Sequence, residues 1–167
     1  MYLGAVAGLA AGLAGSFVME RFQSLAFPGG GGEDDPATLK AANDASETAR
    51  GKKLAHDEKK PAGEGVHYAF GAALGIAYGM LAEAEPRVTM GAGAAFGTAV
   101  VLIADDLAVP AFGWGKWPAQ ASLRTHAYGL ASHLVFGFAS EATRRVVRGA
   151  LRGTWWALLG SNQRPTD

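Results

Sequence analysis

Apolar residues fill four long stretches of this sequence, and most polar residues lie between them. The stretches cover residues 3–20, 66–84, 89–109 and 126–143. Each is close to the length of about 20 residues that an α-helix needs to cross about 30 Å of hydrocarbon. The pattern predicts an all-α fold, a transmembrane four-helix bundle with up-and-down topology and a single membrane domain.

Two alternatives bear on this prediction. A soluble helical bundle requires a polar face on its helices, and the first three stretches have almost none. A secretory signal peptide is an alternative for residues 3–20, but such a peptide begins with basic residues that are not present here. We therefore favour four membrane-spanning helices.

The polar segments have a different character. Residues 27–65 form a long polar connection, in which Asp35 and Pro36 are typical of a helix start and Gly51 of a helix end. We expect a short amphipathic helix between them, on the membrane surface or against the bundle, and a solvated connector after it. The tail, residues 146–167, is expected at the membrane interface.

Glycine recurs at four-residue spacing in the first three predicted helices, and two glycines lie eight residues apart in the fourth. In a membrane, small residues at this spacing let two helix backbones approach closely and pack. The predicted helix-packing positions are Gly4, Gly8, Gly12, Gly71, Gly75, Gly79, Gly93, Gly97, Gly129 and Gly137.

Six ionisable side chains fall in one half of the predicted bundle, because consecutive helices run in opposite directions. They form a candidate polar cluster of His67, Asp105, Asp106, His126, His133 and Glu20. Burying an ionisable group in a membrane costs about 2.5 to 3.5 kcal/mol, so such a cluster requires partners, water or a function. Hydrogen bonds between aspartate and histidine that hold the helices together are the favoured explanation. A proton or cation pathway and a metal or haem site are the alternatives.

Charged residues also gather at the other end of the bundle. There we expect cytoplasmic-face ion pairs among Glu83, Glu141, Arg144 and Arg145. An even number of crossings puts both termini on one side of the membrane. The arginines after residue 143 place that side in the cytoplasm by the positive-inside rule, although lysines in residues 27–65 favour the opposite orientation.

The amino-acid composition and the absence of known motifs argue against several classes of function. The formal net charge is zero, so nothing favours nucleic acid as a partner. The chain has no cysteine, which excludes disulfides, thiolate metal sites and cysteine nucleophiles. No nucleophile elbow, phosphate-binding loop, dinucleotide fingerprint or zinc-protease motif is present. We therefore predict no enzymatic activity, no catalytic residue and no metal ligand.

The sequence resembles the YagU-like family of small bacterial inner-membrane proteins with about four spans. The similarity runs through PAGEGVHYAFGAALGIAYGMLAEAEP, GAGAAFGTAVVLIADDLAVPAFG and THAYGLASHLVFGFASEATRRVVR. The positions that carry it include His67, Pro110, His133, Glu141, Arg144 and Arg145. The resemblance implies a multi-pass protein of the bacterial inner membrane with cytoplasmic N- and C-termini. It implies no reaction.

Together these features predict an integral inner-membrane protein without enzymatic activity. We expect it to be a structural or accessory subunit, surrounded by the lipid bilayer, within a larger membrane complex or a homo-oligomer. A small proton or cation channel or transporter that uses the His/Asp cluster is the alternative. A haem- or metal-binding membrane protein is a further alternative, although we expect no cofactor.

Overall fold

The computed structural model describes residues 1–28 and 35–161, with side chains described as far as Gly153. Every regular element in these residues is helical, as the all-α prediction requires. In chain order the elements are α1 (Tyr2–Ala26), α2 (Ala37–Arg50), α3 (His56–Ala84), η1 (Pro86–Gly93), α4 (Ala94–Val100), η2 (Val101–Ala108), α5 (Val109–Ala111), η3 (Pro118–Gln120) and α6 (Leu123–Ser161).

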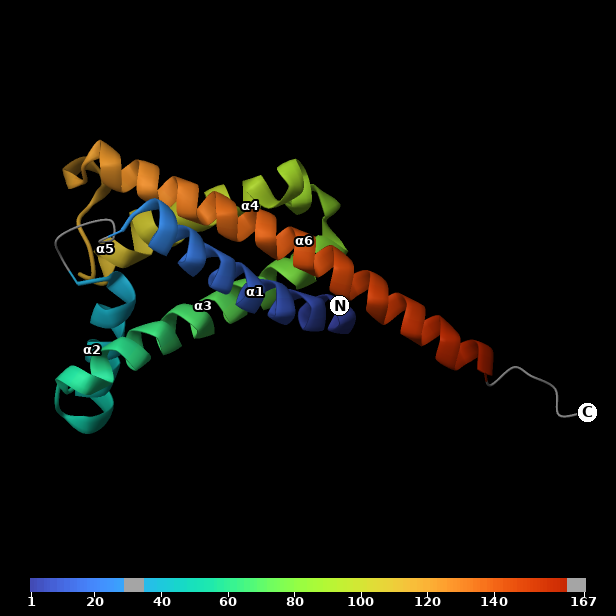
Figure 1. Cartoon of the computed structure of the whole chain (residues 1–167), viewed down its shortest axis with the longest axis horizontal. Coiled ribbons are helices and arrows are strands. Elements are labelled where there is room, and N and C mark those ends of the chain that lie inside the picture. The colour runs from blue at the N-terminus through green and yellow to red at the C-terminus, as the bar shows by residue number, and fades with distance from the viewer. Residues whose placement is uncertain (29–34, 162–167) are drawn as a thin grey trace, which may run out of the picture.

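Helix α1 packs against both α3 and α6, and α4 packs against α6 (Figure 1). Because α4, η2 and α5 follow one another without a break, they form one long helical segment. Three segments of the described residues are long and apolar enough to cross a membrane, namely Tyr2–Ala26, His56–Ala84 and Pro86–Ala111. Helix α6 is not among them, because polar residues such as His133, Glu141 and Arg144 are spread along its length.

Glycines form the contact between α1 and α3. These helices run antiparallel, and Gly4, Gly8 and Gly12 lie against Gly79, Gly75 and Gly71 in that order. A Cβ atom added at Gly75 would lie 2.6 Å from both the Cα and the N of Gly12. Since real Cβ atoms keep a greater distance than this, only glycine permits the observed separation of the two helices.

A second glycine contact joins the third helical segment to α6. Gly93 lies against the backbone of Gly137, and Gly97 lies against the backbone of His133. Gly93 also has a φ of +99°, a left-handed conformation that glycine adopts easily. Its conformation and its close contact therefore both exclude a larger side chain.

Helix α3 begins ten residues earlier than the sequence pattern predicted, at His56 instead of residue 66. The Glu58 carboxylate accepts a hydrogen bond from the Ala55 backbone N–H at 2.8 Å and so caps the helix. Asp57 and Glu58 also lie in the first turn, where a carboxylate interacts favourably with the helix dipole. This capping outweighs Pro61, so residues 56–65 of the predicted connector are helical, although most of them are exposed as expected.

The third helical segment, Ala94–Ala111, begins and ends later than the sequence pattern predicted. The sequence pattern predicted residues 89–109, but the regular helix begins at Ala94 and ends at Ala111. Met90 is extended, and Gly91, Ala92 and Gly93 all have positive φ, so the chain cannot be helical there.

Helix α6 continues from Leu123 to Ser161, well beyond the predicted end at residue 143, and projects from the bundle (Figure 1). Residues 146–161 of the predicted tail are thus helical, and residues 162–167 lie outside the described part of the chain. Helix α2 begins at Ala37. Pro36, which was predicted as the first helical residue, has extended backbone angles and precedes the helix. Gly51 ends α2 in the left-handed conformation, as expected.

Candidate functional site

A pocket of about 490 Å³ lies among the long helices, on the side of the bundle near α2. Helices α1, α3 and α6 and the segment from α4 to α5 supply its walls, and the first turn of α2 contributes to one end. Most of the lining is apolar. The polar side chains in the lining are Ser16, Gln23, Thr38, His67, Asp105, Trp114, Tyr128, Ser132 and His133.

His133 and Asp105 form the central polar pair of this pocket. His133 is 8% exposed, and its Nδ1 lies 2.9 Å from the Gly129 carbonyl oxygen and 3.4 Å from Asp105 Oδ2. Because the carbonyl accepts a hydrogen bond, Nδ1 must carry a proton. In the neutral ring Nε2 is then an acceptor, and no described residue donates a hydrogen bond to it.

Two buried hydroxyl groups also line the pocket. Ser16 on α1 and Ser132 on α6 are both 0% exposed, and neither Oγ has a hydrogen-bond partner among the residues that the structure describes. Ser140, which is equally buried, donates a hydrogen bond to the Ala11 carbonyl at 3.2 Å. A buried polar group without a partner costs about 1 to 3 kcal/mol, so Ser16 and Ser132 differ from an ordinary structural serine.

Asp105 and Asp106 lie in a π-helical segment, Val101–Ala108. Pro110 follows this segment, and its ring would clash with a backbone carbonyl one turn earlier in a regular α-helix. The wider π-helix relieves this clash, and π-helical turns occur frequently at functional sites. Asp105 lines the pocket, whereas Asp106 is half-buried and does not.

The other members of the predicted polar cluster have different surroundings. His67 lines the pocket, and its Nε2 lies 3.3 Å from the Ser16 carbonyl oxygen. Glu20 accepts a hydrogen bond from the Tyr68 hydroxyl at 2.6 Å, and His126 Nε2 lies 3.0 Å from the Pro118 carbonyl oxygen. The structure therefore brings His67, Asp105 and His133 to one pocket and leaves Glu20, Asp106 and His126 outside its lining.

Sequence analysis did not identify several residues of the pocket. Ser16 is the lone hydroxyl group of residues 3–20, and this isolation was a usable signal, whereas Ser132 shares residues 126–143 with Tyr128, Ser140 and Thr143. Trp114 and the first turn of α2 carried no such signal, because they reach the pocket only through the path of the loops. The Trp114 Nε1–H donates a hydrogen bond to Asp44 Oδ2 of α2 at 2.6 Å.

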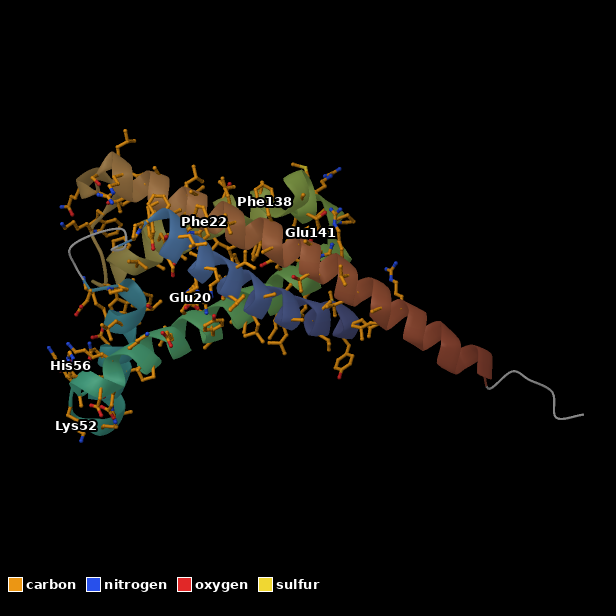
Figure 2. All side chains as sticks on the ribbon, in the orientation of Figure 1. Glu20, Phe22, Lys52, His56, Phe138 and Glu141 are labelled. Carbon is orange, nitrogen blue, oxygen red and sulfur yellow. The ribbon has the colours of Figure 1, made fainter. Side chains whose placement is uncertain are left out.

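A second polar group lies at the opposite end of the bundle. Glu141 is 1% exposed and accepts hydrogen bonds from the Tyr78 hydroxyl at 2.7 Å, Arg144 Nε at 2.7 Å and Arg145 Nε at 2.6 Å. Glu83 instead pairs with Arg148, at 2.5 and 2.8 Å. Figure 2 shows Glu20 nearer to α2 and Glu141 nearer to the projecting part of α6.

Aromatic side chains separate these two polar regions. The Tyr78 ring stacks on the Phe96 ring with centroids 4.1 Å apart, and Phe96 contacts Phe136 at 5.7 Å. Phe136 belongs to the buried apolar core together with Val100. A layer of apolar side chains therefore lies between the His133–Asp105 pair and Glu141.

Helix α2 is attached to α3 by an exposed ion pair. Arg50 Nη1 lies 2.9 Å from Glu58 Oε1, and Arg50 also donates hydrogen bonds to Ser46 Oγ. The hydrogen bond to the Glu58 carboxylate raises the pKa of the Arg50 guanidinium above its ordinary value. Leu39 of α2 contacts α3 near Gly63, so an apolar contact supports this attachment.

The long apolar helices, packed through glycine faces around a mostly apolar pocket, are compatible with a helical membrane protein. The described residues contain no group of three or more histidine and acidic side chains arranged to hold a metal ion.

A comparison with protein-family models matches residues 34–142 to the family described as "Protein of unknown function (DUF1440)". The match covers more than half of the chain, and the chain therefore belongs to this family. Comparisons with curated proteins and with solved structures gave no match. The matched region includes α2, α3 and the first half of α6, with His67, Asp105 and His133.

Proposed function

We propose that all four long helical segments cross the bacterial inner membrane and that both termini are cytoplasmic. Three of these segments meet the requirements of length and hydropathy. Helix α6 packs along α1 and α4, and its polar residues have partners on other elements, since Ser140 bonds to Ala11 of α1 and His133 lies 3.4 Å from Asp105. The resemblance to the YagU-like family and the arginines that follow residue 143 support the same orientation.

Labelling of single introduced cysteines tests this topology. No other thiol in the protein would react, because the chain has no cysteine of its own. A membrane-impermeant maleimide should label Ala119→Cys in cells whose outer membrane has been permeabilised. It should label Met90→Cys and Gly153→Cys only after the inner membrane is broken. If α6 does not cross, Gly153→Cys reacts on the same side as Ala119→Cys, and the four-span proposal is wrong.

We further propose that the protein is a non-enzymatic accessory subunit that holds an apolar small molecule in the pocket. The observation that carries this proposal is the pair of buried hydroxyls, Ser16 and Ser132, without partners in a mostly apolar pocket. The volume of about 490 Å³ lies within the range of small-molecule sites. Such a ligand would have an apolar body and one polar end that donates to His133 Nε2 and bonds to the serine hydroxyls.

Extraction of the purified protein with organic solvent, followed by mass spectrometry, tests for this ligand. We expect one apolar molecule per chain from the wild type. Ala108→Phe, which fills the pocket, should lose it, whereas Ala111→Phe, an exposed position on the same helical segment, should retain it. Equal amounts of all extracted molecules from the three proteins would refute the proposal.

The hydroxyl groups have a matched control within the same fold. Ser132→Ala should lower the occupancy of the ligand, because it removes an unpaired group of the pocket. Ser140→Ala should leave the occupancy unchanged, because Ser140 bonds to Ala11 and does not line the pocket. A Soret band or a stoichiometric metal in the purified protein would instead favour the haem or metal alternative.

A proton or cation pathway is the second candidate, and the contact of 3.4 Å between His133 and Asp105 favours it. The aromatic layer of Tyr78, Phe96 and Phe136 argues against a continuous route in this conformation. Proton flux into proteoliposomes distinguishes the two functions. A flux that Asp105→Asn and His133→Ala both abolish would favour transport, and a flux that neither changes would exclude the pair from the route.

A further inference from the structure

Four arginines gather around a second pocket, at the end of the bundle opposite to α2. This arginine pocket has a volume of about 390 Å³. Ala82, Glu83 and Pro86 form one side of it, and α6 supplies Arg144, Arg145, Arg148, Gly149 and Arg152. The arginines lie within about 100° of one another around α6, so their side chains project toward the same space.

The carboxylates nearby neutralise only part of this charge. Glu141 pairs with Arg144 and Arg145, and Glu83 pairs with Arg148. Four guanidinium groups and two carboxylates leave a local charge of +2. Arg152 is exposed and forms no ion pair with any described residue, and Arg145 is 61% exposed in its side chain.

Arg148 supplies an independent observation. Its Nε and Nη2 donate to Glu83, but its Nη1 is buried and has no acceptor among the described residues. The N–H groups of a guanidinium form a planar fork that matches the oxygen atoms of a phosphate group. The unused donors of Arg148 and the unpaired charge of Arg152 belong to the same pocket.

We propose that the arginine pocket binds the phosphate group of an anionic molecule. The pocket lies where α3 ends and where α6 leaves its apolar stretch, the depth at which lipid headgroups meet a membrane protein. A phospholipid headgroup and a soluble phosphate compound offer the same chemistry, and the experiment separates them. This site is independent of the ligand proposed for the other pocket.

Native mass spectrometry and thermal shift test the proposal with the full chain in detergent. The two probes are phosphatidylglycerol, with diacylglycerol as the comparison that lacks a phosphate group, and inorganic phosphate. Preference for phosphatidylglycerol identifies a lipid source, and stabilisation by inorganic phosphate alone identifies a soluble source. If phosphatidylglycerol binds no better than diacylglycerol and inorganic phosphate does not stabilise the protein, the proposal is overturned.

The variants Arg152→Gln and Arg124→Gln form a matched pair, because both positions are exposed on α6 and only Arg152 lines the pocket. Arg152→Gln should weaken binding of the anion about fivefold, the loss typical of one arginine near a membrane surface. Arg124→Gln should leave binding unchanged. Equal affinity of the two variants would overturn the assignment, and the circular dichroism of each variant verifies that it has folded.

Discussion

Replacing Gly75 by alanine should separate α1 from α3. The added Cβ would lie 2.3 Å from the Gly8 carbonyl oxygen and 2.6 Å from the Gly12 backbone, whereas ordinary contacts begin near 3.4 Å. The two helices must therefore move apart by about 1 Å, and a gap of this size forfeits a quarter to a half of each neighbouring van der Waals contact. Overpacking of this kind costs about 1 to 3 kcal/mol.

Gly65→Ala provides the control on the same helix. A Cβ added at Gly65 meets no atom within 4 Å, so this change should only gain helix propensity, about 0.5 to 1 kcal/mol. Thermal unfolding of both variants in the same detergent measures the difference. At about 2 to 4 °C per kcal/mol, Gly75→Ala should lower the Tm by about 2 to 12 °C, and Gly65→Ala should raise it slightly. If both variants unfold at the wild-type temperature, the glycine contact does not determine the packing of these helices.

Other variants examine the remaining contacts. Tyr78→Phe removes one hydrogen bond to the buried Glu141 carboxylate and should cost about 1.5 to 3 kcal/mol, whereas Glu141→Ala strands Arg144 and should cost about 3 to 5 kcal/mol in the same unfolding assay. If the two variants lose the same free energy of unfolding, the proposed hydrogen-bond network of Tyr78, Glu141 and Arg144 is wrong. Gly113→Ala introduces backbone strain alone, about 1 to 3 kcal/mol, and Gly93→Ala should cost more because its Cβ also meets the Gly137 backbone. Arg50→Ala should leave the Tm unchanged but increase proteolysis within α2, since its ion pair with Glu58 is exposed. Proteolysis at the wild-type rate would show that the apolar contacts of α2 suffice.

The sequence was most informative where one physical requirement dominates. A four-residue spacing of glycines has few explanations in apolar helices, and the structure places Gly8 against Gly75 and Gly93 against Gly137. The early start of α3 was missed because it depends on the Glu58 cap and on Arg50, a partner in another helix. The late start of the third helical segment was missed because Ala92 adopts a positive φ, which its residue type does not signal.

The candidate site was predictable only in part. Antiparallel order was enough to place His67, Asp105 and His133 in one half of the bundle. It could not distinguish His133 from His126, which turns to the Pro118 carbonyl, since this choice depends on the path of a loop. The π-helical segment also changes the directions of Asp105 and Asp106 from those of an α-helix, and only Asp105 reaches the pocket.

Helix α2 sits over one end of the pocket, and its contacts differ in kind from those of the long helices. Its polar attachments, Arg50 to Glu58 and Asp44 to Trp114, are exposed and are therefore weakened by salt and water. The glycine faces of the long helices are buried and respond to neither. Added salt should therefore loosen α2 at one end of the pocket and leave the contacts between the long helices unchanged.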